Sequence, residues 1–397
     1  MDENGQKIKS VPFCRILCDG HELEYVREVL DSGWLTTAGK AQKLEKLFAE
    51  AVGAKFACAV NSATAALHLA SDAVGIKRGD KVLVPTMTFT ASAEVIRYLG
   101  ADPILLDVDY GTCMLTPEIL LEGLKQHPDT KAVMIVHYGG QAAEMVADGN
   151  GILEICQQHG LKLIEDAAHA FPSKFKGRMI GTFGDATCFS FYANKTITTA
   201  EGGMLVTDDE AIYKRAKVMR LHGINRDVWD RFTAKGAPWE YDVIAPGFKY
   251  NMPDLNAAIG LAQLERAEEL RQGRQRCAEY YLNHLRDMPE VDLPVCNVSM
   301  NEHSWHLFPI VLTTKSKISR NIFIEKMSEA SIGTSVHYKP LHRMTYYKER
   351  YKLLPEQFPV AEQIWQGNVS LPIFPSMSGG ELAYVCETIK RLVLKGA

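Results

Sequence analysis

The sequence lacks the features that mark membrane proteins and zinc fingers. No apolar run approaches transmembrane length, and the polar first residues lead into no signal-peptide stretch. Its nine cysteines include one close pair, Cys14 and Cys18, with no second pair at zinc-finger spacing. These absences favour a protein of the cytoplasm with reduced thiols and no membrane partner.

The sequence is also short of net charge and of the usual nucleotide-binding motifs. With 44 basic and 48 acidic residues its net charge is only -4, so no overall field attracts nucleic acid and we expect no such partner. Neither G-x-G-x-x-G nor G-x-x-x-x-G-K-[ST] is present. What is present is a hydrophobic content of 46% over 397 residues, enough for one large domain and a smaller one.

Short apolar runs alternate with helical patterns through the first half of the chain. Runs of this kind, apolar throughout, are typical of parallel strands that are buried on both faces. The pattern predicts an α/β fold with seven strands in one mainly parallel sheet, at 56–60, 82–84, 103–108, 132–137, 161–164, 186–191 and 203–206. It predicts helices beside them at 20–31, 40–52, 65–73, 91–98 and 152–159.

The rest of the chain predicts a smaller α+β domain. An apolar stripe predicts one long helix over 253–288 that joins the two parts. Beyond it the sequence predicts a strand at 303–312 and helices at 320–330 and 383–394. We therefore expect a large domain over 1–252, and a linking helix with a small C-terminal domain over 253–397.

Lys195 and Asp166 are the residues that indicate chemistry. Each follows a predicted strand, and ligands in open α/β sheets bind outside the carboxyl ends of the strands. An unprotonated lysine amine can form a Schiff base with an aldehyde cofactor, and a carboxylate can keep a pyridine nitrogen protonated. A lone lysine is nearly always a solvated surface charge. The pair, however, predicts a pyridoxal phosphate (PLP) site that needs no metal.

Other residues near strand ends have two readings each. Thr64 and the Ala65 amide, at a predicted helix start, suit a phosphate, or merely cap the helix. Phe89 could stack on a flat ring or belong to the core. His169 stands three residues after Asp166, whose carboxylate could instead cap a helix, and Ser190 stands five before Lys195.

Glu201-Gly-Gly203 closes the segment around Lys195, directly before the last predicted strand. Glycine adopts backbone conformations that other residues avoid. We therefore expect the two glycines to allow a tight turn.

The chain resembles the DegT/StrS family of PLP-dependent nucleotide-sugar aminotransferases, of fold type I. The likeness covers nearly all of the chain, from Ser-Gly-Trp-Leu-Thr-Thr at 32–37 and Glu-Asp-Ala-Ala-His at 165–169 to Ser-Phe-Tyr-Ala-Asn-Lys at 190–195 and His-Tyr-Lys-Pro-Leu-His at 337–342. Within the family it looks most like the branch that makes UDP-4-amino-4-deoxy-L-arabinose, judging also by 200–203 and 305–308.

The resemblance implies roles for the cofactor set. Lys195 is the Schiff-base lysine and proton shuttle, and Asp166 is the partner of the pyridinium nitrogen. The ring and phosphate are held by His169, Phe89, Thr64, Ala65 and Ser190. The family works as a homodimer with shared active sites. Lys249 is expected to cross to the partner's phosphate, although Lys249 and Asn251 stand where the family has asparagine and arginine.

The resemblance also implies the substrates. These are L-glutamate and a nucleotide sugar with a keto group at position 4, contacted by Trp34, Thr36, Arg231, His337 and His342. Packing against a partner subunit is an equal reading for Arg231, and a structural role is an equal reading for each histidine. Phe89 stands where the arabinose branch has tryptophan, which leaves the exact sugar open.

Three alternatives remain. One is amination at position 3. Another is a PLP-dependent sugar dehydratase, but such enzymes replace the lysine by histidine, so Lys195 argues against it. The third is a catalytically silent relative that binds the sugar and regulates. The intact set of Lys195, Asp166 and phosphate-binding residues argues against that one.

Overall fold

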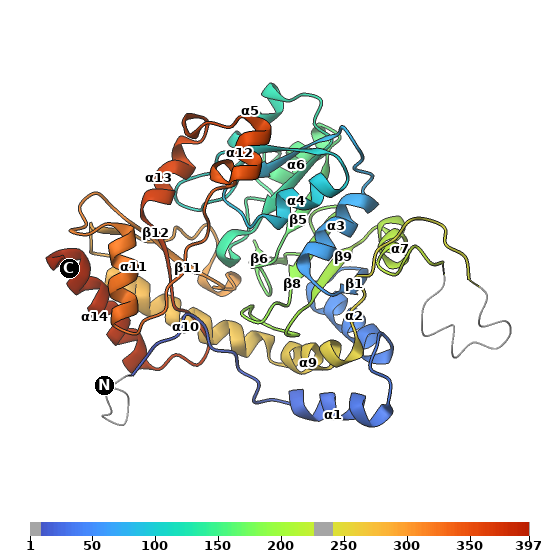
Figure 1. Cartoon of the computed structure of the whole chain (residues 1–397), viewed down its shortest axis with the longest axis horizontal. Helices are drawn as coiled ribbons and strands as arrows, with labels where there is room; N and C mark the ends of the chain where they lie inside the picture. The colour runs from blue at the N-terminus through green and yellow to red at the C-terminus, as the bar shows by residue number, and fades with distance from the viewer. Residues whose placement is uncertain (1–8, 226–240, 397) are drawn as a thin grey trace.

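One open seven-stranded sheet organises the chain in its computed structural model, which describes residues 9–225 and 241–396 (Figure 1). The strand order is β1-β9-β8-β5-β4-β2-β3, and only β9 runs against its neighbours. The predicted mainly parallel sheet is confirmed. Its strands are β1 (Phe56–Val60), β2 (Lys81–Pro85), β3 (Asp102–Leu106), β4 (Ala132–Val136), β5 (Lys162–Asp166), β8 (Ala186–Ser190) and β9 (Gly203–Thr207).

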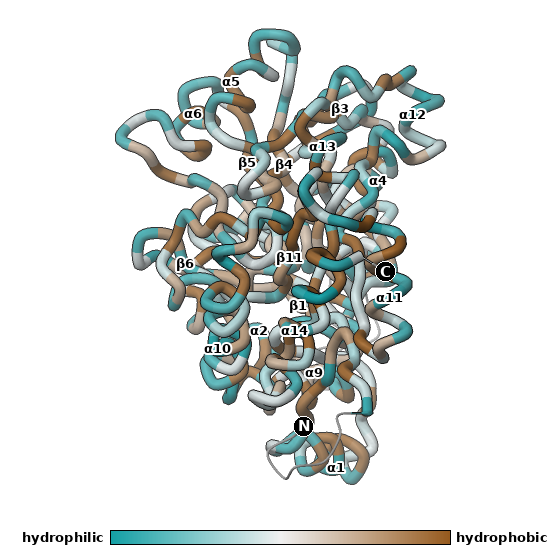
Figure 2. The backbone as a smooth tube through the Cα atoms, turned by 90° about the vertical axis from the view of Figure 1, so that its left-hand side faces the viewer, coloured by the Kyte–Doolittle hydropathy of each residue, from teal (hydrophilic) through white to brown (hydrophobic). Residues whose placement is uncertain are grey.

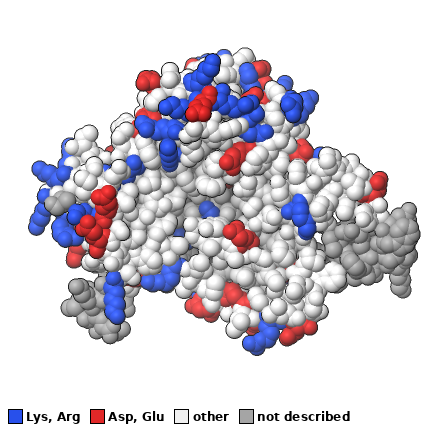
Figure 3. All heavy atoms as spheres, in the orientation of Figure 1, with Lys and Arg blue, Asp and Glu red and all other residues white. Residues whose placement is uncertain are grey.

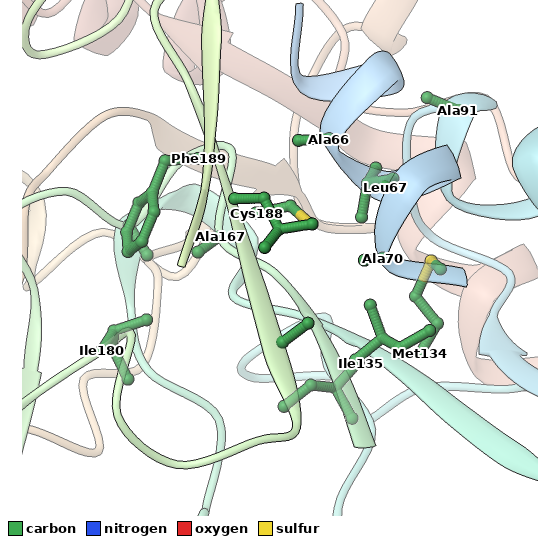
Figure 4. Close-up of a cluster of buried hydrophobic side chains, with 14 of the residues drawn as sticks. Ala66, Leu67, Ala70, Ala91, Met134, Ile135, Ala167, Ile180, Cys188 and Phe189 are labelled. Atoms are coloured by element: carbon green, nitrogen blue, oxygen red, sulfur yellow. The ribbon is translucent and has the colours of Figure 1, made fainter. Parts of the chain in front are cut away.

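Helices cover the sheet and close the main core. In the close-up of Figure 4, small and apolar residues of α3, namely Ala66, Leu67 and Ala70, lie over the strands that carry Cys188 and Met134. Small side chains let a helix approach a sheet closely. The helices of this region are α3 (Ala63–Ala73), α4 (Ala91–Tyr98), α5 (Pro117–Gln126), α6 (Ile152–Gln158) and α7 (Glu210–Met219).

Helix α2 (Gly39–Val52) receives its N-terminal cap from a distant part of the chain. Both carboxylate oxygens of Asp254 accept hydrogen bonds from backbone amides at its start, from Ala38 at 2.8 Å, Lys40 at 3.0 Å and Ala41 at 3.0 Å. Amides in the first turn have no partner inside the helix, so the carboxylate replaces the missing acceptors. Asp254 therefore links α2 to the region that follows the sheet.

The single long helix predicted over 253–288 is wrong. The structure has two helices, α9 (Asp254–Glu265) and α10 (Ala267–Leu285), which Figure 1 shows end to end along one edge of the molecule. Arg266 separates them, because its φ of -112° and ψ of 11° lie outside the helical region. Its guanidinium binds Asp19 and Glu269 and so ties the break to the N-terminal segment.

The smaller part is an antiparallel three-stranded sheet with helices beside it. Its sheet consists of β10 (Val291–Asp292), β11 (Phe308–Leu312) and β12 (Asn368–Leu371), and the predicted helices are α11 (Arg320–Glu329) and α14 (Gly379–Lys395). The predicted strand 303–312 begins only at Phe308. Trp305 has a φ of +52°, a left-handed conformation that no strand residue can take. Residues 303–307 are therefore a buried loop.

The two hydrophobic cores exchange segments across the expected boundary at 252/253. Val11 lies in the core of the smaller part and pairs with Ile332. Helices α12 (Thr345–Tyr351) and α13 (Pro359–Gly367) return to the main core. The division into 1–252 and 253–397 stays a prediction. The remaining elements are α1 (Glu22–Ser32), the hairpin β6 (Lys174–Phe175) and β7 (Arg178–Met179), and 3-10 turns at Tyr138–Gly140, Met300–Glu302, Leu341–Arg343 and Pro355–Gln357.

The outer surface is polar and mixed in charge. Hydrophilic residues lie along outer helices such as α10 (Figure 2), and basic and acidic side chains are interspersed around the face shown in Figure 3. Among the described residues, no helix combines the length and the apolar character that crossing a bilayer requires.

Candidate active site

A pocket of about 430 Å³ lies at the carboxyl ends of β5 and β8. It brings together seven of the predicted site residues: Thr64, Phe89, Asp166, His169, Ser190, Lys195 and His337. A larger hollow, of about 530 Å³, lies beside the edge strand β3 and contains none of them. The sheet therefore places six of these groups in one cavity through their positions at strand ends, and the loop that carries His337 joins them.

Lys195 reaches the pocket from the turn after β8. Its backbone N–H donates to the Tyr192 carbonyl at 2.9 Å, and its Nζ lies 3.3 Å from Nε2 of His306. Burial lowers the pKa of the amine to about 7; the Asp166 carboxylate opposes this effect and the Arg274 guanidinium adds to it. The amine is therefore substantially neutral near pH 7, as a nucleophile or base must be.

Asp166 ends β5 inside the pocket and is 5% exposed. Its Oδ2 accepts a hydrogen bond from Ser92 Oγ at 2.7 Å, and its Oδ1 accepts one from the Ala168 amide at 3.1 Å. Burial raises the pKa of the carboxyl group, and these two hydrogen bonds oppose that rise. Its surroundings hold the carboxylate in place without pairing it fully with a cation.

His169 lies next to Asp166 with both ring nitrogens engaged. Its Nδ1 accepts from the Gly139 amide at 3.3 Å, so Nε2 carries the hydrogen and donates to the Tyr338 hydroxyl at 3.0 Å. Burial, followed by the charges of Lys195 and His337, lowers the pKa of His169 well below its usual value. A neutral ring with a fixed tautomer thus borders the pocket.

The start of α3 faces the same cavity through Ser62, Ala63 and Thr64. The expected contribution of the Ala65 amide is less direct, because this amide donates to Ser62 Oγ at 3.1 Å and Ala65 does not line the pocket. The first amides of a helix have no partner within it and favour an anion. Ser190 lines the cavity nearby, where its hydroxyl accepts a hydrogen bond from the Tyr192 amide.

The expected turn at Glu201-Gly-Gly203 needs glycine for a different reason. Neither glycine has a positive φ. A Cβ on Gly203 would instead lie 2.6 Å from the backbone of Ser62 and Ala63, and one on Gly202 would lie 2.1 Å from Thr199 Oγ1. Gly203 thus allows the close approach of β9 to the start of α3, and Gly202 allows the close approach of the Thr199 side chain.

Phe89 lies at the pocket mouth with 56% of its surface exposed, so the core reading does not hold for it. Its ring centroid is 6.0 Å from that of Tyr338, and the planes are inclined by 52°. An exposed aromatic face at a pocket wall is available for stacking.

Other predicted residues lie outside this pocket. His342 is buried, with Nδ1 2.8 Å from Thr86 Oγ1 and Nε2 2.7 Å from Glu362, an arrangement that favours its structural reading. Trp34 donates its backbone N–H to Ser32 Oγ, and the Thr36 carbonyl accepts from the Asp254 amide.

The two remaining candidates concern the partner subunit and the substrate. Lys249 is exposed, and its Nζ contacts Asn251 within the chain. Arg231 lies outside the described residues. Lys249 does not line the pocket that the described residues of this chain enclose.

The sequence interpretation missed Ser92, His306, Tyr338 and Arg274. Ser92 is a small polar residue in the first turn of a helix that follows a strand, a signal that could have been used. His306 lies within the stretch 305–308 and Tyr338 within the motif 337–342, but neither was given a role of its own. Arg274 lies far from the motifs in sequence, and only the fold brings it to the site.

These residues fit PLP. The start of α3 suits its phosphate, the buried carboxylate of Asp166 suits a pyridinium nitrogen, and the Lys195 amine suits its aldehyde. The fold and the site together define a PLP-dependent enzyme of fold type I.

The chain belongs to the DegT/DnrJ/EryC1/StrS aminotransferase family, whose model matches residues 17–390. It is 42% identical over 389 residues to the spore coat polysaccharide biosynthesis protein SpsC of Bacillus subtilis, with 98% of each chain covered. It is 40% identical over 378 residues to the uncharacterized protein MJ1066 of Methanocaldococcus jannaschii, covering 95% of this chain and 96% of the relative.

Solved structures agree with this family. Helicobacter pylori PseC, an aminotransferase involved in the biosynthesis of pseudoaminic acid, superposes with a TM-score of 0.88 at 25% identity, over 97% of this chain and 99% of PseC. The PLP form of the sugar aminotransferase Spr1654 of Streptococcus pneumoniae superposes with a TM-score of 0.87 at 29% identity, over 98% of this chain and 100% of that one. The protein is thus an aminotransferase, and PLP is its cofactor.

Proposed function

We propose that this aminotransferase moves the amino group of L-glutamate to the keto carbon of a 4-keto nucleotide sugar, with UDP as the expected carrier. The observation that carries the proposal is the position of the Lys195 amine, with a pKa of about 7, in one pocket with the buried carboxylate of Asp166. Amine transfer requires a lysine that can lose and regain a proton near neutral pH.

The chain's own groups divide the work. Bound here, PLP supplies the electron sink that stabilises negative charge next to the reacting nitrogen. The carboxylate of Asp166 would hold its ring nitrogen in the protonated form, and the start of α3 and Ser190 would hold its phosphate. Lys195 Nζ, as a neutral amine, would accept the proton of the donor carbon and return it.

The sugar substrate is supported by the relatives. SpsC is named for spore coat polysaccharide biosynthesis, and PseC for the biosynthesis of pseudoaminic acid. We therefore assign the product to a cell-surface polysaccharide or other glycan, made in the cytoplasm. His337 lines the pocket and is the best-placed candidate to contact the sugar. Trp34, Thr36, Arg231 and His342 remain weaker candidates.

We also propose that two copies form a homodimer with shared active sites. Phe89 and Tyr192 line the same pocket and expose 56% and 48% of their surfaces, so two exposed aromatic side chains border one cavity. Among the described residues that line the pocket, Lys195 is the only lysine or arginine. A second copy would cover the aromatic mouth, and its Lys249 could supply the charge that a phosphate or carboxylate needs.

A substrate panel tests the assignment. The purified enzyme loaded with PLP should release 2-oxoglutarate from L-glutamate, and release should become catalytic when a 4-keto nucleotide sugar is added. Lys195→Ala should show no glutamate-driven turnover. Turnover of 3-keto sugars alone would overturn the position-4 assignment, and removal of a hydroxyl without amine transfer would indicate a dehydratase.

A further inference from the structure

The Lys195 amine has a side-chain partner in the loop before β11. Nε2 of His306 lies 3.3 Å from Lys195 Nζ, and His306 lines the pocket while only 4% of its surface is exposed. Its ring centroid lies 4.5 Å from that of His169. The imidazole therefore touches the reacting amine on one side and the ring beside Asp166 on the other.

Arg274 binds the backbone next to both Lys195 and His306. Its guanidinium, buried in α10, donates to the carbonyl oxygens of His306 at 3.3 Å, Ile373 at 3.0 Å and Asn194 at 3.1 Å. Asn194 directly precedes Lys195, so one side chain ties the backbones of both the lysine and the histidine. Among the described residues no carboxylate pairs with Arg274. A buried cation without a carboxylate is costly, which indicates that it is retained for what it positions.

His306 meets Lys195 as a neutral ring. Burial, followed by the charges of Lys195, His169 and Arg274, lowers the pKa of His306 well below its usual value. A proton placed on this ring would sit among cationic groups in a desolvated site. His306 is therefore unsuited to storing a proton, and its contact with Lys195 is a hydrogen bond between neutral groups.

The tautomer of His306 is not fixed by a second partner. In a neutral imidazole one nitrogen donates and the other accepts. Backbone amides hold Nδ1 of His169 and of His137 as acceptors, at 3.3 Å and 3.0 Å. By contrast, Nδ1 of His306 is buried and has no partner among the described residues. No contact forces the hydrogen onto Nε2, so this nitrogen can accept from the amine.

We propose that His306 is a further catalytic residue, which accepts one N–H of Lys195 and so turns the nitrogen lone pair toward the cavity, with Arg274 as the positioning residue behind both. The inference rests on the aminotransferase assignment and not on the identity of the sugar. Without this hydrogen bond the Lys195 amine would still be neutral, but its lone pair would point away from the cavity and proton transfer by Lys195 would be slow.

The first test uses the full-length protein freed of PLP. Lys195 is acetylated with acetic anhydride over a range of pH, and the modified peptide is quantified by mass spectrometry. In the wild type, the pH at half-maximal acetylation should lie at about 7, because burial and the charges of Asp166 and Arg274 set the pKa of Lys195. His169 and His337 also face the amine. His306→Phe removes a hydrogen-bond acceptor for the protonated amine of Lys195, so the acetylation midpoint should fall by about one pH unit. His306→Gln, which places an amide oxygen near the same point, should restore it.

The second test measures proton transfer in the PLP-loaded enzyme. His306→Phe should slow hydrogen exchange at the α carbon of L-glutamate about a hundredfold and enlarge the isotope effect with α-deuterated glutamate. PLP affinity should change little, and His306→Gln should recover part of the rate.

His303→Phe is the matched control, because His303 is a buried histidine of the same loop. Its ring stacks on Trp305, with 3.9 Å between the ring centroids. It should behave as wild type in both tests. A wild-type midpoint and exchange rate in His306→Phe, or equal changes in His303→Phe, would overturn the proposal. If wild-type enzyme exchanges no glutamate proton, the assigned donor fails, while the acetylation midpoint still decides the role of His306.

Discussion

Ser92 donates a hydrogen bond from its Oγ to Oδ2 of Asp166 at 2.7 Å, across a separation of 74 residues. Ser92 stands in the first turn of α4, which follows β2, whereas Asp166 ends β5. β4 lies between these two strands in the sheet. The contact therefore spans three strands and fixes the buried carboxylate that lines the pocket.

Ser92→Ala should weaken PLP binding. The variant removes a hydrogen bond to a charged oxygen, which favours the ionised form, so the pKa of Asp166 should rise further and PLP affinity should fall about tenfold. The measurement is a titration of the cofactor-free enzyme with PLP, followed by absorbance. Ser71→Ala is the control, because Ser71 is equally buried and its hydroxyl has no partner among the described residues. Equal losses in both variants would contradict the role of Ser92.

The stability of the cofactor-free protein should depend on pH through Lys195. Its pKa is lowered from 10.5 to about 7 on folding, so between these values the unfolded chain binds more protons than the folded one. Stability contributed by this group therefore rises with pH across that window. Lys195→Met lacks the titration, so it should have the higher Tm below pH 7, and the difference should shrink toward pH 10. A difference that stays constant with pH would show that the amine titrates normally.

Arg274→Met should raise the pKa of Lys195. The guanidinium is one of the charges that lowers this pKa, and it also holds the Asn194 carbonyl. The acetylation midpoint of Lys195 should move above that of the wild type. Arg276→Met is the control, because Arg276 lies on the same helix and also donates to carbonyl oxygens, of Pro375 and Met377, but is exposed. If both variants move the midpoint equally, loss of helix packing and not the buried cation is the cause.

Gly203→Ala should impair the phosphate end of the site. A methyl group there would lie 2.6 Å from the backbone of Ser62 and Ala63, so the start of α3 must shift. We expect a higher dissociation constant for PLP and for inorganic phosphate as a competitor, measured by the same absorbance titration. Gly39→Ala, where nothing lies within 4 Å of the added carbon, should bind PLP normally. Unchanged affinity in Gly203→Ala would place the phosphate elsewhere.

Asp254→Ala should destabilise the fold more than a surface substitution. It leaves three amides at the start of α2 without an acceptor, which should lower the free energy of unfolding by about 2 kcal/mol. Denaturant unfolding of the cofactor-free protein measures this loss. Asp254→Asn keeps one carbonyl acceptor and should lose less. A loss no larger than that of Glu50→Ala, on the exposed side of α2, would contradict the capping role.

The sequence predicts site residues best where their position depends only on one strand and the residues that directly follow it. Lys195 and Asp166 were found because each follows an apolar run, and the ends of parallel strands meet at one edge. Six predicted site residues, namely Thr64, Phe89, Asp166, His169, Ser190 and Lys195, reach one pocket for this reason. The seventh, His337, follows no strand of the sheet and was predicted only from the family resemblance.

The sequence predicts the ends of helices and strands poorly where a contact with a distant part of the chain determines them. The cap of α2 comes from Asp254, and Arg266 at the break between α9 and α10 binds the distant Asp19; neither contact leaves a local pattern. The strand predicted through His306 fails because Trp305 takes a left-handed conformation in a buried loop. Periodicity describes which face is apolar, but it does not show which loops the rest of the chain will bury.

The exchange of segments between the two cores affects how the chain is made. Val11 can pair with Ile332 only after that distant residue has been synthesised, and the main core is complete only when Tyr347 and Ile364 are present. A ribosome has therefore released most of the chain before either core has all its members, and apolar surface stays open during synthesis. A deletion that includes Val11 removes part of the smaller core, and one that includes Tyr347 and Ile364 removes part of the main core.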